Sequence, residues 1–138
     1  MADDLDELHA QAGLALLVAD PGLVVFDGKV PDGALPPYVL VYTTVERPAG
    51  EMGVANALDG LSATVTATWY CHCVGESAAA ARAVAMRVSR ALLDRRPTIA
   101  GRACGLIRQG EMTPPNRDET TGRLVMDLVA VYHLTTTP

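Results

Sequence analysis

The most regular pattern in the chain is an alternation of apolar and polar side chains from Leu61 to Val74. Successive side chains of a β-strand point to opposite faces, so a period of two predicts a strand with one buried face. The expected buried face is Leu61, Ala63, Val65, Ala67, Trp69, Cys71 and Cys73, and the expected polar face is Ser62, Thr64, Thr66, Thr68, Tyr70 and His72. We expect this strand to lie at the centre of the fold.

Two segments repeat apolar side chains at helical spacing. Residues 3–20 predict a helix that Asp3 or Asp4 caps, and residues 77–95 predict a second helix. The expected apolar stripes are Leu5, Leu8, Ala12, Ala15 and Leu16 in the first helix, and Ala80, Val84, Val88, Ala91 and Leu92 in the second. His9 is expected at the exposed, acidic side of the first helix.

Four further apolar segments predict strands, at residues 23–26, 38–45, 98–112 and 123–137. Polar stretches with Gly and Pro predict extended loops near 46–60 and 111–122. The resulting order α-β-β-β-α-β-β predicts a single α+β domain over residues 1–138. Its sheet is expected to be mostly antiparallel, with about five strands and with two helices packed on one face.

Composition narrows the class of protein. With 138 residues and 49% hydrophobic side chains, the chain can bury a sizeable core. The net charge of −5 argues against a free-standing nucleic-acid binder, which usually has a basic face. Three cysteines do not make a disulfide framework, and the acidic residues after Met1 argue against a signal peptide. The apolar runs are shorter than a membrane span, so we expect no membrane contact.

Cys71, His72 and Cys73 resemble a metal-binding triplet, because Zn²⁺ takes Cys and His ligands. Two sulfurs bonded to one ion at about 2.3 Å lie roughly 4 Å apart, whereas residues two apart on a strand are separated by about 6.6 Å. His72 also points to the face opposite the cysteines. Cys104 and His133 lie on other predicted strands, and nothing in the sequence brings them to this point. We therefore expect two core cysteines and no metal site.

The segment 75–79, Gly-Glu-Ser-Ala-Ala, resembles the G-x-S-x-G turn that presents a nucleophilic serine, but it lacks the last glycine. Its possible triad partners are His133 and one of Asp94, Asp118 and Asp127. The chain is short for a hydrolase of that fold and has no oxyanion segment of the HGGG type. We favour Ser77 as the N-cap of the second helix, with a small serine hydrolase as an alternative.

Taken together, these pieces resemble the tail terminator (tail completion) family of long-tailed, lambda-like bacteriophages. The resemblance rests on the order of four features across almost the whole chain. They are the amphipathic N-terminal helix, Asp27-Gly28 before Leu35-Pro36-Pro37-Tyr38, the junction "VGESAAAARA", and "RDETTGRL" before the final strand.

The resemblance implies a structural virion protein with no catalytic activity and no cofactor. It implies a homohexameric ring that caps the tail tube at the end nearest the head. One face of the ring would meet the major tail tube protein and the other a head-completion or neck protein, while DNA passes through without sequence-specific binding. A head-completion or neck connector protein is the alternative. From loop position, the expected interface residues are Arg47, Glu51, Arg117, Asp118 and Glu119.

Overall fold

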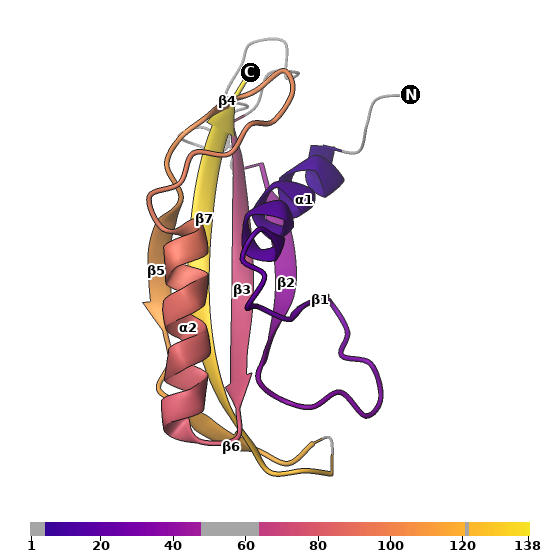
Figure 1. Cartoon of the computed structure of the whole chain (residues 1–138). Helices are drawn as coiled ribbons and strands as arrows, with labels where there is room; N and C mark the ends of the chain where they lie inside the picture. Colours follow the sequence, from indigo (N-terminus) through magenta and orange to yellow (C-terminus); the bar gives the residue numbers. More distant parts are fainter. Residues whose placement is uncertain (1–4, 48–63, 121) are drawn as a thin grey trace.

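A single sheet backed by two helices makes up the computed structural model, which describes residues 5–47, 64–120 and 122–138 (Figure 1). The elements in chain order are α1 (Leu5–Val18), β1 (Val25–Asp27), β2 (Tyr38–Glu46), β3 (Val65–Gly75), α2 (Ala78–Leu92), β4 (Ala103–Cys104), β5 (Arg108–Met112), β6 (Asn116–Asp118) and β7 (Val125–Thr137). None of the described helices is long and apolar enough to cross a membrane.

The sheet has the order β1-β2-β3-β7-β4, and β5 and β6 also pair with β7. Only the β1–β2 pair is parallel, so the prediction of an α+β fold with a mostly antiparallel sheet is confirmed. The described residues form seven strands, more than the predicted five or so. The segment 98–112 divides into β4 and β5, and β6 lies inside the predicted loop 111–122. β7 is 13 residues long, and several short segments together satisfy the backbone groups along its outer edge.

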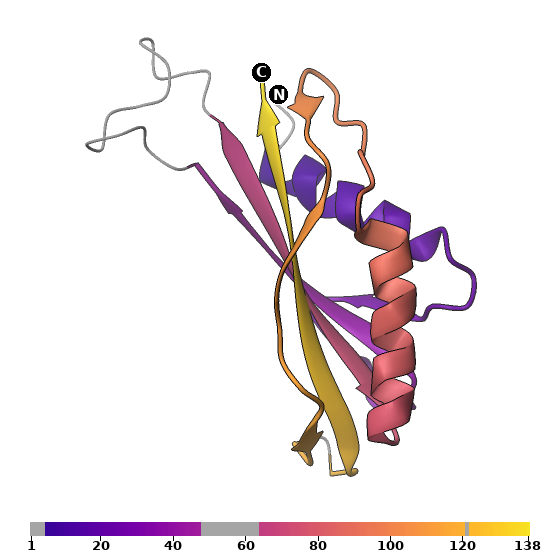
Figure 2. The ribbon, with the colours of Figure 1, turned by 90° about the vertical axis from the view of Figure 1, so that its left-hand side faces the viewer.

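Both helices pack on the same face of the sheet, as predicted (Figure 2). The alternation seen in the sequence holds along β3, because Val65, Ala67, Trp69, Cys71 and Cys73 are all buried. Trp69 is fully buried between its register partners Thr43 of β2 and Tyr132 of β7. Leu17, Val88, Leu92 and other helix residues complete this core. The alternation therefore identified both the central strand and its buried face.

The buried face of α1 differs from the prediction. The buried side chains are those of His9, Gly13, Leu14 and Leu17, whereas Ala15 is exposed. The helix is turned because Gly13 lies against the Trp69 indole, where a larger side chain would not fit. The expectation that His9 lies at the surface was wrong. Its Nδ1 donates a hydrogen bond to the Leu5 carbonyl (2.7 Å), and its Nε2 lies 2.8 Å from Thr136 Oγ1.

The second helix is shorter than predicted and ends at Leu92. The capping residue Leu93 donates its backbone N–H to Ser89 O and has an extended backbone, and Asp94 then adopts a positive φ of 59°. Aspartate tolerates this left-handed conformation better than most residues, so the chain turns here and not at Pro97. The buried side chains of α2 are Ala81, Val84, Ala85, Val88 and Leu92.

Candidate functional site

One face of the sheet carries no helix, and we call it the open face. By register, its central rows join Leu40 to His72 and Val129, Tyr42 to Tyr70 and Val131, and Thr44 to Thr68 and His133. Tyr42 and Tyr70 are exposed. The predicted polar character of β3 on this side is therefore confirmed, although Thr68 itself is buried by its neighbours.

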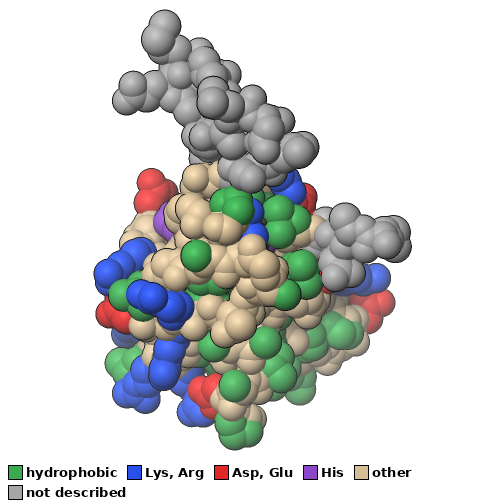
Figure 3. Space-filling model, turned by 90° about the horizontal axis from the view of Figure 1, so that it is seen from above, with side chains coloured by type: hydrophobic (Ala, Val, Ile, Leu, Met, Phe, Trp, Pro, Cys, Tyr) green, Lys and Arg blue, Asp and Glu red, His purple; other side chains and the backbone are tan. Residues whose placement is uncertain are grey.

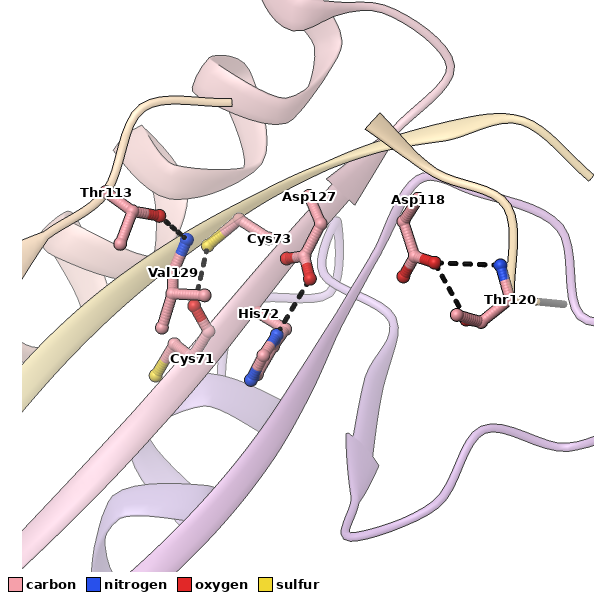
Figure 4. Close-up of polar contacts among 8 residues, drawn as sticks. All are labelled: Cys71, His72, Cys73, Thr113, Asp118, Thr120, Asp127 and Val129. Atoms are coloured by element: carbon pink, nitrogen blue, oxygen red, sulfur yellow. Dashed lines mark hydrogen bonds and ion pairs between the residues drawn. The ribbon is translucent and has the colours of Figure 1, made fainter. Parts of the chain in front are cut away.

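A polar group on the open face centres on His72 (Figure 4). His72 Nδ1 donates a hydrogen bond of 2.9 Å to Asp127 Oδ2, and the Tyr42 ring meets the imidazole edge-on with 5.5 Å between centroids. Asp118 accepts hydrogen bonds from the backbone N–H and the hydroxyl of Thr120, at 2.9 and 2.7 Å. Lys29 joins these residues around a hollow of about 390 Å³, which we call the His72 hollow.

Hydrogen bonds and charges around the His72 hollow shift the pKa values of His72 and Asp118. The hydrogen bond to Asp127 raises the pKa of His72, and the negative charges of Asp127 and Asp118 add to this, while partial burial opposes it. The hydrogen bonds from Thr120 lower the pKa of Asp118, and the charge of His72 acts in the same direction. The surroundings of the hollow thus favour the charged forms of His72 and of Asp118.

The two cysteines beside His72 lie in the core, on the opposite side of the sheet. Cys71 and Cys73 are fully buried. Burial raises the pKa of the Cys71 thiol to about 12 and also raises the pKa of the Cys73 thiol. Metal ligation and nucleophilic attack both require the thiolate, which burial suppresses here. Among the described residues, no group of three or more His, Cys, Asp and Glu side chains could hold a metal ion.

Ser77 is the N-cap of α2, as predicted. Its backbone is extended, and its Oγ accepts a hydrogen bond of 3.1 Å from the Ala80 backbone N–H. His133 pairs in register with Thr68, seven residues before Gly75 on the same strand, so about 23 Å of β3 separates it from the turn that holds Ser77. His133 Nδ1 is instead 3.0 Å from Thr68 Oγ1. The serine and histidine of the predicted triad are therefore not brought together.

The expected interface residues fall at two opposite ends of the sheet. Arg47 follows β2 and forms an ion pair of 2.5 Å with Asp6, while Glu51 lies outside the described residues. Arg117 and Asp118 belong to β6, and Arg117 lies 3.3 Å from Glu119. The register places these two ends about ten residues apart along β7, or roughly 33 Å. They form two separate charged ends and not one patch.

A groove that the sequence did not indicate runs between α2 and the segment joining β5 to β6. Its apolar lining is Ala85, Met86, Met112, Pro114, Pro115 and Leu128, with Arg82 at the rim, and its volume is about 550 Å³. Thr113 fixes one wall, because its N–H donates to Val129 O (2.8 Å). Its hydroxyl also accepts from Val129 N–H (3.0 Å), as Figure 4 shows. We call it the α2 groove. Its two sides come from segments about 25 residues apart, which explains why periodicity did not reveal it.

Comparison with known proteins identifies relatives of the chain. The family described as "Tail completion protein gp17" matches residues 5–133. A solved structure described as "Virion of native gene transfer agent (GTA) particle" contains a chain with the same fold, at a TM-score of 0.64 and 19% identity. That similarity covers 99% of this chain and 97% of the other. No curated protein sequence matches the chain.

Proposed function

Because the chain belongs to the tail completion protein gp17 family, we propose that it closes the head-proximal end of a phage tail tube as a homohexameric ring. Tail completion and a place in the virion follow from the family. The proposal adds the ring, its six copies and its neighbours. One face of the ring binds the last ring of the major tail tube protein, and the other binds a head-completion or neck protein.

The family match over residues 5–133 is the observation that carries this proposal, because it spans the chain from α1 to β7. The geometry supports it in a second way. A ring that joins two structures needs a contact surface at each end of its axis. The sheet carries charged residues at both ends, with Arg47 at one and the pair Arg117 and Glu119 at the other. These ends are the expected docking surfaces for tube and neck.

The open face also suits a channel through which DNA passes. The side chains that β2, β3 and β7 direct to this face include Thr, Tyr, His and Asp but no Lys or Arg, although Lys29 lies beside them at the His72 hollow. Phosphate groups bind chiefly to Lys and Arg, so such a surface offers passing DNA little to adhere to. We propose that the open face lies toward the lumen of the ring.

Ser77 has no part in this function. Its hydroxyl accepts a hydrogen bond from the Ala80 N–H, and His133, which would have to activate it, lies beside Thr68 instead. The protein acts through surfaces that bind other virion proteins.

Removing the gene from its phage tests the proposal. Without the protein, electron microscopy is expected to show filled heads and unattached tails of abnormal length, because nothing stops tube growth or joins the tube to the neck. Expression of the protein in trans restores joined particles of normal tail length. Tails of normal length beside heads that have lost their DNA would overturn the proposal and indicate a head-completion role instead.

A further inference from the structure

Charge is distributed unequally between the two halves of the chain. Residues 78–138 contain nine of the eleven Lys and Arg residues but only five of the sixteen Asp and Glu residues. Figure 3 shows Lys and Arg side chains gathered on the flank that carries α2 and β5, at the left in Figures 1 and 3. The first 77 residues are correspondingly acidic. The molecule therefore has a basic flank and an acidic remainder, a distribution that favours contact between unlike surfaces of two copies.

The basic flank contains the α2 groove. Met86 and Met112 are exposed at 56% and 46%, and both line this one groove. Methionine is flexible and polarizable, so a pair of methionines accommodates an incoming apolar side chain well. Arg82 lies one helical turn before Met86, on the same side of α2, and forms no ion pair with any residue that the structure describes. The groove thus combines an apolar lining with the positive charge of Arg82, which no described residue neutralises.

The complementary features lie on the loop between β1 and β2, at the other flank of the sheet (Figure 1). Leu35 is 63% exposed there. Asp32 is exposed three residues earlier, also without an ion pair among the described residues. Asp32 and Leu35 both line one hollow beside this loop. An exposed leucine beside an aspartate matches an apolar groove beside an arginine.

We propose that, in the ring, the β1–β2 loop of one subunit docks into the α2 groove of the next, with Leu35 between Met86 and Met112 and Asp32 beside Arg82. The two surfaces differ and lie on opposite flanks of one sheet, as a heterologous contact requires if rotation is to close a ring. The apolar contact supplies most of the affinity, because an exposed ion pair contributes little, and the charges set the register. This inference rests on the proposed ring and names the contact between its subunits.

Disulfide cross-linking tests the contact in assembled tails and in purified protein. In a Cys104→Ser background, Leu35→Cys combined with Met86→Cys is oxidised with copper–phenanthroline and run on a non-reducing gel. A ladder of multimers that disappears on reduction is expected. The matched control replaces Leu35→Cys with Val18→Cys, which is equally exposed, at 63%, but lies at the end of α1. The control is expected to give no ladder.

A charge exchange provides an independent measurement. Asp32→Arg alone and Arg82→Asp alone each place two like charges at the contact and are expected to weaken self-association several-fold, and the double variant is expected to recover most of the loss. Both positions are at the surface, so circular dichroism should report folded variants. The proposed contact is wrong if oxidation gives no cross-linked multimers and the double charge variant does not recover self-association. If the tails still join heads in that case, the ring proposal itself stands. If wild-type protein forms no multimer even on tails, the ring proposal fails with it.

Discussion

Gly13 of α1 lies so close to Trp69 of β3 that a Cβ atom at position 13 would stand 2.3 Å from Trp69 Cε2. Trp69 is fully buried at the centre of the sheet. The contact sets how closely α1 packs on the sheet and which side of the helix faces the sheet. It explains why His9 and Leu17, which lie on the same side of the helix as Gly13, are buried.

Gly13→Ala is therefore expected to destabilise the protein, although alanine favours helices. The better helix propensity contributes about 1 kcal/mol, whereas forcing a methyl group into a filled core costs about 1–3 kcal/mol or more. Because the indole is rigid and enclosed, we expect the clash to dominate and the free energy of unfolding to fall by about 1–2 kcal/mol. Urea denaturation measures this. Ala15→Gly at an exposed site serves as a control that loses helix propensity alone, and a Gly13→Ala protein more stable than wild type would contradict the contact.

The sequence predicted an element correctly where the local pattern of apolar and polar side chains was enough to identify its buried face. β3 was predicted correctly because one of its faces is fully apolar and the other polar. α1 has apolar side chains around most of its circumference, so periodicity could not select the buried face. The contact with Trp69, 56 residues away, made that selection. The hydrogen bond between His72 and Asp127 likewise depends on the register of β3 against β7, which no local pattern encodes.

His9→Ala is expected to cost about 2–4 kcal/mol, because it removes a fully buried side chain and two hydrogen bonds. The substitution leaves a cavity between α1 and β7 and removes one of the two partners of Thr136 Oγ1, the other being Arg102 Nε. Thermal and urea unfolding of the purified protein give the loss. Gln11→Ala, on the exposed side of the same helix, is expected to change stability by less than about 0.5 kcal/mol. Equal effects of the two substitutions would contradict the buried position of His9.

The pKa of His72 should be higher in the folded protein than in the unfolded chain, because Asp127 stabilises the imidazolium. The interaction therefore contributes its full stability below the unfolded pKa, and this contribution is lost as the pH rises through the folded pKa. NMR titration of the His72 ring protons reports the folded value directly. Asp127→Asn should lower it and flatten the dependence of stability on pH in this range. An unchanged His72 titration in Asp127→Asn would contradict the pairing.

Ser77→Ala is expected to reduce stability by about 1 kcal/mol, because it removes the side-chain acceptor for the Ala80 N–H. Ser77→Asp should keep most of the stability, since aspartate also caps helices well. Urea denaturation compares the three proteins. A hydrolase would behave differently: both variants would lose ester hydrolysis that the wild type shows, and the loss would not follow stability.

We propose that six copies form one ring at the head-proximal end of the tail tube. Cryo-electron microscopy of the virion neck, with this protein's fold fitted to the density, tests it most directly. We expect a single six-fold ring between the last tube ring and the neck, with the open face of each sheet toward the lumen. Density for this fold along the tube, within the head vertex, or with a different rotational symmetry would contradict the account.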